Sequence, residues 1–202
     1  CRLVVQGGKV HTRTSAACTG QGMATVCTSM VCTAAGLSPE DVIHDAPDTA
    51  LTPNSGTTTA SRQTLFTGEA TRRAAELLRE ELSQGKTLQD LEGREFYGEY
   101  SGVTDKMGAD VPNPVSHVAY SYGAQVVIMD ENKAVTRVVA AYDVGRVINP
   151  PACEGQVEGG VLMGLGYGLT EDFVMENGLV KSTYGTLGLI RAPQAPEIQT
   201  IF

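Results

Sequence analysis

The chain has 202 residues, of which 42% are hydrophobic and 19% are charged, and its formal net charge is −8. This length and hydrophobic content suffice for one sizeable core, or for two small lobes that share one, and they exclude a disordered chain. Because no basic cluster exceeds Arg72-Arg73, neither nucleic acid nor an anionic membrane is expected as a partner. No stretch reaches about 18 uninterrupted apolar residues, so we predict a soluble protein.

The chain begins at Cys1 without an initiator methionine, which leads us to expect a piece of a larger protein. Its cysteines are odd in number and form no CxxC pair, as expected in a reducing cytoplasm. The three histidines lie far apart and near no cysteine at ligand spacing. We therefore predict no zinc or iron–sulfur site and no metal-ligating residue in this chain.

The first elements predicted are a hairpin and a helix. Residues 2–6 and 9–15 alternate apolar and polar side chains around Gly7-Gly8, which indicates two antiparallel strands joined by a tight turn. Apolar residues then recur at helical spacing over 23–35, and Gly36 ends the pattern. Gln21, between two glycines, precedes this helix, where free N–H groups favour an anion.

A second unusual stretch follows a capped turn at 38–41 and a short strand at 42–44. Residues 48–64 are dense in short hydroxyl side chains and lead into an amphipathic helix that ends near Ser83. Hydroxyls and helix-start N–H groups would together hold a phosphate or a polar ring without net positive charge. A threonine-rich capped turn with no ligand is the alternative from composition alone.

The remainder of the chain is predicted to alternate strands and loops around one further helix. Residues 93–108 fit a strand and a mobile loop, and the prolines of 110–116 favour a boundary between lobes 1–112 and 113–202. Further strands are expected at 117–129, 134–142, 171–175, 179–182 and 198–202. This order of elements indicates an α+β fold with mainly antiparallel sheets and packed helices.

Residues 143–168 form the least ordinary run, because seven glycines stand among apolar residues. Pro150-Pro151 suits a helix entry, so a helix is predicted from about Ala152 to Leu169. Its glycines recur four apart and form smooth strips, at a cost of about 1 kcal/mol each against alanine. Close packing or a ligand would offset that cost. Gln156 offers an amide to a heterocycle edge, although a satisfied glutamine in a core helix is the plainer alternative.

These motifs together resemble the large subunit of the molybdenum hydroxylases, the xanthine dehydrogenase and aldehyde oxidase family. The resemblance rests on GQG at Gly20–Gly22, the hydroxyl-rich loop, GAQV at 123–126, DVGR with NP at 143–150, and GQVEG at 155–159, in that order. It covers nearly the whole chain. The resemblance implies that the chain folds as a fragment of the molybdopterin-binding domain.

The resemblance also implies roles for individual residues. The cofactor-binding residues would be Gly20, Gln21, Thr59, Ala60, Ser61, Gln63, Thr64 and Gln156. Thr59 and Ala60 would border the metal and the substrate pocket. Thr59 departs from the small apolar residue that family members often carry there. The family's general-base glutamate would follow Phe202, so no catalytic residue is assigned here and the isolated chain is expected to be inactive.

The activity implied is hydroxylation of a heterocycle or aldehyde carbon with oxygen derived from water, most plausibly of the xanthine or purine dehydrogenase type. The cofactor would be molybdenum-molybdopterin, with a cytosine dinucleotide form left open. A 2Fe-2S centre and FAD would lie on partner domains or subunits, beside the remaining part of the molybdenum subunit. One alternative is a non-catalytic cofactor-holding or assembly subunit of a split enzyme, and another is a carbon monoxide dehydrogenase of the molybdenum type.

Overall fold

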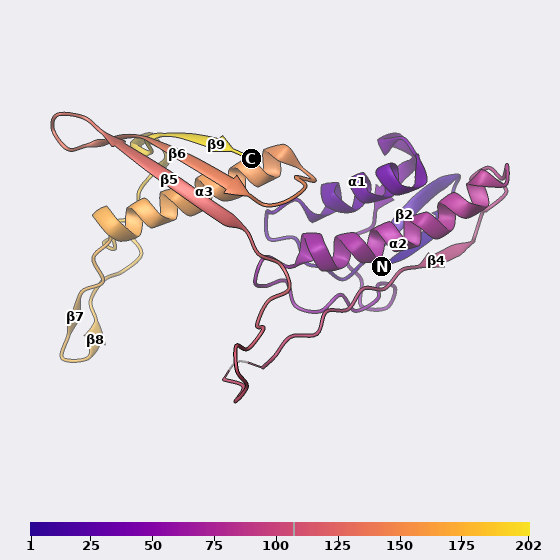
Figure 1. The fold of residues 1–202 in the computed structure, drawn as a ribbon, viewed down its shortest axis with the longest axis horizontal. Helices are drawn as coiled ribbons and strands as arrows, with labels where there is room; N and C mark the ends of the chain where they lie inside the picture. The colour runs from indigo at the N-terminus through magenta and orange to yellow at the C-terminus, as the bar shows by residue number, and fades with distance from the viewer. Residues whose placement is uncertain (107) are drawn as a thin grey trace. The chain divides into compact units, whose positions relative to one another are not determined.

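The computed structural model describes residues 1–106 and 108–202, which form two compact units, Cys1–Tyr120 (unit 1) and Ser121–Phe202 (unit 2) (Figure 1). Each unit combines helices with a sheet, and most strand pairs are antiparallel, in agreement with the predicted α+β class. Met107, within the loop predicted at 93–108, lies outside the described residues. No helix among the described residues is long and apolar enough to cross a membrane.

Unit 1 is built on a four-stranded sheet. The predicted hairpin is confirmed: β1 (Arg2–Gln6) pairs with β2 (Lys9–Arg13), and both turn glycines have positive φ, as a two-residue turn requires. β3 (Val42–His44) adds parallel to β2, and β4 (Glu95–Tyr97) adds antiparallel to β1, in the order β3-β2-β1-β4. A short 3-10 helix, η1 (Pro39–Asp41), precedes β3.

Two helices cover one face of this sheet. α1 (Met23–Ala35) and α2 (Gln63–Ser83) have the predicted bounds to within a residue, and Gly36 ends α1 in the left-handed region. Leu3, Val5 and Val10 of the hairpin pack with Val31 of α1 and Leu78 of α2, all fully buried. Gly98 follows β4, and a Cβ there would lie 2.0 Å from the Ala70 carbonyl oxygen, so only glycine allows α2 to approach so closely.

Unit 2 has a three-stranded sheet and one long helix. β5 (Tyr122–Met129) pairs antiparallel with β6 (Val135–Asp143), which pairs parallel with β9 (Glu197–Ile201). α3 (Pro150–Leu169) packs Val161 against Val138 and Ala140 of β6. β7 (Met175–Glu176) and β8 (Leu179–Val180) form a short hairpin, and η2 (Ala192–Gln194) precedes β9.

Several predicted boundaries were wrong for one reason, the extent of the partner strand. The strand predicted at 117–129 begins at Tyr122, because its partner ends at Asp143, which stands opposite. The strand predicted at 9–15 ends at Arg13, after which the chain bonds to a loop. The last hairpin has only two residues in each strand, not the four or five predicted.

Candidate functional site

Seven of the eight predicted binding residues lie in unit 1, on two loops. The first loop, Ala17–Gly22, ends at the start of α1 and carries Gly20 and Gln21. The second, which we call the hydroxyl loop, spans residues 53–62 and carries Thr59, Ala60 and Ser61; Gln63 and Thr64 follow it in the first turn of α2. Gln156 lies in unit 2 on α3, where it is exposed.

A seam of short hydroxyl side chains joins the segment after β2 to the start of the hydroxyl loop. The Thr14 and Ser55 hydroxyl oxygens are 2.6 Å apart, and the Ser55 amide donates to the Ser15 hydroxyl at 2.7 Å. The Ser15 amide in turn donates to the Ser55 hydroxyl at 3.2 Å. Thr14 is fully buried. The seam therefore holds residues 14–15 beside Ser55, more than forty residues further along the chain.

A second set of hydrogen bonds links α2 to the Ala17–Gly22 loop. Inside α2, the Thr67 hydroxyl donates to the Gln63 Oε1, and the Gln63 Nε2 donates to the Thr58 hydroxyl at 3.2 Å. The Thr58 hydroxyl then donates to the Ala17 carbonyl at 3.1 Å, and the Gln21 Nε2 donates to the same carbonyl at 2.9 Å. The structure thus brings the Gly20–Gln21 loop and the hydroxyl loop together.

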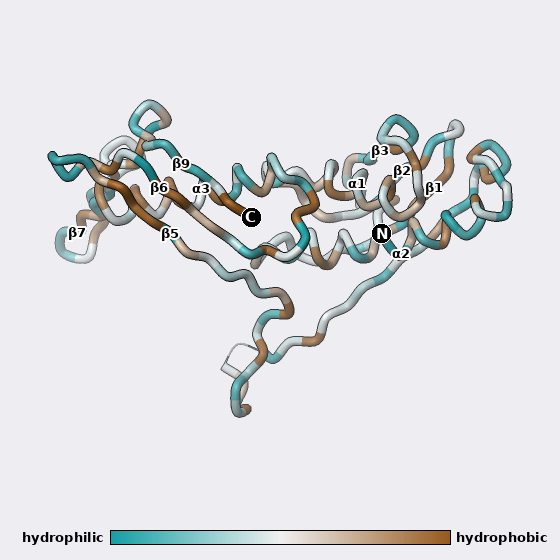
Figure 2. Tube along the Cα trace, turned by 45° about the horizontal axis from the view of Figure 1, so that its top comes forward, coloured by the Kyte–Doolittle hydropathy of each residue, from teal (hydrophilic) through white to brown (hydrophobic). Residues whose placement is uncertain are grey.

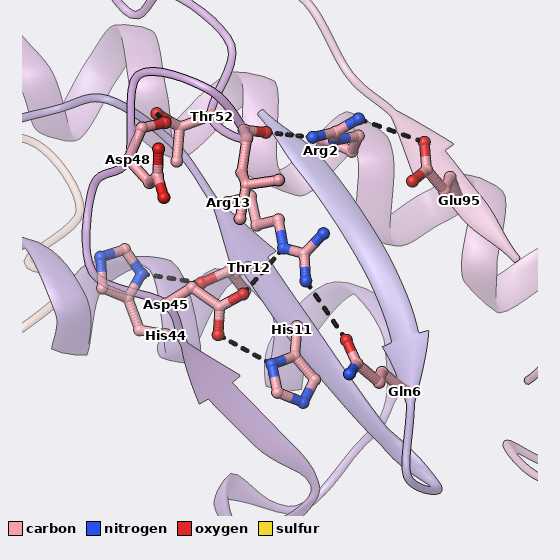
Figure 3. Close-up of polar contacts among 11 residues, drawn as sticks. Arg2, Gln6, His11, Thr12, Arg13, His44, Asp45, Asp48, Thr52 and Glu95 are labelled. Carbon is pink, nitrogen blue, oxygen red and sulfur yellow. Dashed lines mark hydrogen bonds and ion pairs between the residues drawn. The ribbon is translucent and has the colours of Figure 1, made fainter. Parts of the chain in front are cut away.

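The segment that leads from β3 into the hydroxyl loop is fixed at its start by Asp45 (Figure 3). The Asp45 carboxylate lies 2.7 Å from the His11 Nδ1 and accepts from the Arg13 Nε at 2.8 Å. Burial by itself would raise the pKa of Asp45, but the hydrogen bonds and charges of Arg13 and His11 outweigh it and lower that pKa. On the same strand pair, burial lowers the pKa of His44, whose Nδ1 meets the Thr12 hydroxyl at 2.7 Å.

The two helices that follow these loops begin without a capping side chain. α1 starts after Gly22 and α2 after Arg62, and neither residue's side chain bonds to the first turn, whereas in unit 2 the Asn149 Oδ1 accepts from the Ala152 amide. Neither first turn contains an acidic residue. N–H groups at such starts favour negative charge. In keeping with this, amides of Met23 and Gly20 lower the pKa of the exposed Cys18 thiol.

The backbone of the hydroxyl loop is strained at its tip. Ala60 and Ser61 both have φ of 51°, in the left-handed region, which costs roughly 1 to 2 kcal/mol for each residue with a Cβ. The Arg62 Nε donates to the Thr57 carbonyl at 2.8 Å and closes the loop below this tip. Strain of this kind is common where a backbone is shaped for a ligand.

The predicted residues divide into outward and inward groups. Gly20, Thr59, Ala60, Ser61 and Thr64 are exposed, and their contact with a cofactor stays a prediction. The amides of Gln21 and Gln63 turn into the protein instead, because the Gln21 Oε1 accepts from the Thr19 amide at 2.6 Å and Gln63 is only 4% exposed. In this structure their side chains hold the loops in place.

Two hollows in the described part of the chain are not lined by the predicted residues. One, of about 330 Å³, lies in unit 1 among Ser55, Arg62, Phe66 and the segment 97–102. The other, also of about 330 Å³, lies in unit 2 at the ends of β5, β6 and β9. The hollow of unit 1 adjoins the hydroxyl loop through Ser55 and Arg62, which both line it.

Sequence reasoning missed the residues of the seam. Thr14, Ser15 and Ser55 were not among the predicted site residues. The alternation of inward and outward residues along β2 could have pointed to Thr14. Thr12, Thr14 and Ala16 are all buried, so the inward side of the strand continues past Arg13, where its regular pairing ends. A threonine on that side needs a polar partner, and Ser55 supplies it.

Unit 1 is thus a domain that offers backbone N–H groups and hydroxyls from two tethered loops. The sequence profile of the molybdopterin cofactor-binding domain family matches residues 3–90 and 84–196. The chain belongs to this family.

Proteins of similar sequence agree with this family assignment. An aldehyde oxidoreductase of Megalodesulfovibrio gigas is 31% identical over an alignment of 152 positions that covers 68% of this chain and 17% of that protein. A putative xanthine dehydrogenase molybdenum-binding subunit of Escherichia coli K12 is 26% identical over 238 aligned residues, covering 99% of this chain and 31% of that protein. This chain therefore spans less than a third of either relative.

The fold is also that of solved members. The aldehyde oxidoreductase from Desulfovibrio desulfuricans superimposes with a TM-score of 0.82 at 26% identity, covering 99% of this chain and 24% of that chain. A carbon monoxide dehydrogenase from Oligotropha carboxidovorans gives a TM-score of 0.80 at 21% identity, covering 99% of this chain and 29% of that chain, and it supports the fold alone.

Proposed function

We propose that this chain holds the pterin of a molybdenum cofactor within an oxidoreductase that hydroxylates a heterocycle or aldehyde carbon, most plausibly of the xanthine or purine dehydrogenase type. The observation that carries the proposal is the tethering of the Gly20–Gln21 loop to the hydroxyl loop through Thr58 and Ala17. This tether joins two segments that the family resemblance assigns independently to the cofactor.

The exposed groups of these loops fit a pterin and its phosphate. A fused heterocycle with alternating donors and acceptors needs paired acceptors and donors, and the hydroxyls of Thr59, Ser61 and Thr64 can act as both. A phosphate suits the first turns of α1 and α2, which have neither a capping side chain nor an acidic residue. No net positive charge is needed for such a site.

Gln156 of unit 2, which the family resemblance assigns to the cofactor, lies among the glycines of α3. A Cβ added at Gly155, Gly159, Gly160 or Gly164 would meet nothing within 4 Å. Packing against described residues therefore does not account for these glycines, whose combined cost in helix stability is about 4 kcal/mol. Close approach of a flat ligand accounts for them, with the exposed Gln156 amide available to its edge.

When bound, the molybdenum cofactor would supply the redox chemistry of the hydroxylation, and the task of this chain would be to hold and orient it. Thr59 and Ala60, at the tip of the hydroxyl loop, would border the substrate. The Thr59 hydroxyl would then offer a hydrogen bond to a polar heterocycle, which favours purine-like substrates over plain aldehydes.

The proposal extends to partners and location. The rest of the molybdenum subunit, with its general-base glutamate, and partner domains or subunits with a 2Fe-2S centre and FAD would complete electron transfer. A cytosine dinucleotide form of the cofactor is compatible with the open surface beside the loops. All five cysteines are free, which suits the cytoplasm.

The test is molybdenum stoichiometry, measured by elemental mass spectrometry on the protein purified with its native partners. We expect close to one molybdenum per copy, and Ser61→Ala to bind the cofactor about tenfold more weakly, the expected cost of one charge-assisted hydrogen bond, which would lower the molybdenum retained after dialysis. Ser101→Ala, an exposed serine of the same unit outside both loops, is the matched control. A wild-type preparation free of molybdenum, from cells that make the cofactor, would refute the proposal.

A further inference from the structure

The path from the core of α2 to the Ala17–Gly22 loop runs through a single side chain. The Thr58 hydroxyl accepts from the Gln63 Nε2 at 3.2 Å and donates to the Ala17 carbonyl at 3.1 Å. The hydroxyl donates its proton in one bond and accepts with a lone pair in the other, so the two hydrogen bonds can form at the same time. Thr58 itself is half-buried and is not among the predicted cofactor contacts.

On one side of Thr58, the Gln63 Nε2 has no other hydrogen-bond partner among the described residues. Gln63 is 4% exposed, and its Oε1 already accepts from the buried Thr67 hydroxyl, which fixes the direction of its amide. Its Nε2 must therefore point to Thr58. On the other side, the Ala17 carbonyl also accepts from the Gln21 Nε2. The Gln21 Oε1 in turn accepts from the Thr19 amide and hydroxyl. Removing the Thr58 hydroxyl would leave a buried donor unpaired at one end and free the loop at the other.

We propose that Thr58 is a positioning residue that sets the spacing between the Gly20–Gln21 loop and the strained tip at Ala60-Ser61. Without it, the hydrogen bonds that remain between segments 14–22 and 53–62 among the described residues are those of the seam, at Ser15, Pro53 and Ser55. The inference rests on the proposed function for its consequence, cofactor retention, but its structural part stands on the hydrogen bonds alone.

The experiment compares Thr58→Val with Thr58→Ser in the full chain with its native partners. Valine keeps the shape of the side chain and removes the hydroxyl, whereas serine keeps the hydroxyl. Thr33→Val, at an exposed position near the end of α1, is the matched control. Thr58→Ala serves as a second variant in case valine does not fold.

The first readout is hydrogen exchange of the peptide that contains the Thr19 amide, 39 positions before the substituted residue. We expect about fivefold to tenfold faster exchange in Thr58→Val and Thr58→Ala, from the loss of one net hydrogen bond, and wild-type exchange in Thr58→Ser and Thr33→Val. Equal exchange in the valine, alanine and serine variants would overturn the inference.

The second readout is molybdenum retained per copy after prolonged dialysis. We expect retention to fall several-fold in Thr58→Val and to be restored in Thr58→Ser. Faster exchange with unchanged retention would overturn the positioning role. A wild-type protein without molybdenum would refute the proposed function instead, and the exchange comparison would still decide whether Thr58 couples the loops.

Discussion

Unit 1 and unit 2 bury very different amounts of apolar surface. In unit 1 a sheet and two helices enclose a core that includes Leu3, Val31 and Leu78, each 0% exposed. In unit 2 the buried hydrophobic residues among those described are Val138, Ala140 and Val161. Every residue of β5 is exposed, although the strand is rich in apolar residues, as the brown colour along it shows (Figure 2).

The difference assigns distinct sources of order to the predicted cofactor-binding residues of unit 1 and to those of unit 2. A small domain needs a large buried fraction to offset chain entropy, and unit 1 meets that need with its own residues. Its two loops are therefore anchored to a stable core through Asp45, Ser55 and Thr58. The glycine-rich α3 of unit 2 rests on a core of few residues, so Gln156 has a much less rigid support.

The largest expected effect breaks the core of unit 1. Leu78→Ala should lower its free energy of unfolding by about 2 to 5 kcal/mol, because the side chain is fully buried in α2. Leu77→Ala, one residue earlier and 43% exposed, should cost less than about 1 kcal/mol. Urea unfolding followed by circular dichroism measures both. Similar costs for the two variants would contradict the core described for unit 1.

A smaller effect should separate two paired positions in unit 2. Val138 and Val127 stand opposite each other on β6 and β5, yet they are 1% and 49% exposed. Val138→Thr should destabilise the sheet by about 1 to 3 kcal/mol, since it buries a hydroxyl, and Val127→Thr should change it by less than about 0.5 kcal/mol. Hydrogen exchange of β6 reports both changes. A large cost at Val127 would show that β5 is covered in solution.

The sequence was sufficient for elements with local signals. Turn glycines at Gly7-Gly8 predict the hairpin, and helical periodicity predicts the helices that end at Ala35 and Ser83. Both signals depend on residues only a few positions apart. The parallel pairings of β3 with β2 and of β9 with β6 were not predicted, because pairing depends on segments far apart in the chain. The late start of β5 has the same cause.

The candidate site shows the same division between local and distant causes. The glycines, hydroxyls and amides of the two loops could be identified from composition and order. The inward turn of the Gln21 and Gln63 side chains could not, because it depends on acceptors placed by folding, Ala17 and Thr58. The left-handed Ala60 and Ser61 carry no sequence signal either, since glycine and asparagine are the usual residues there.

The smallest expected effect contrasts the long helices of the two units. In α2, Glu69 forms ion pairs with Arg72 at 2.7 Å and Arg73 at 2.9 Å, whereas no ion pair among the described residues involves α3. Hydrogen bonds from Arg72, then Arg73, lower the pKa of Glu69 to about 2. A carboxyl group with a depressed pKa stabilises the folded state above its unfolded pKa, about 4.3, and loses that contribution as the pH falls through the folded pKa.

Because these side chains face solvent, we expect Glu69→Gln to cost less than about 1 kcal/mol at pH 7. The difference from wild type should shrink between about pH 5 and pH 2, where wild-type Glu69 gains its proton. Glu80→Gln, on the same helix at an exposed position with no ion pair among the described residues, should show no such pH dependence. Urea unfolding of the wild type and both variants at pH 7, 5 and 3 measures these differences in the free energy of unfolding. A cost that stays constant down to pH 3 would mean that the ion pairs on α2 do not stabilise unit 1.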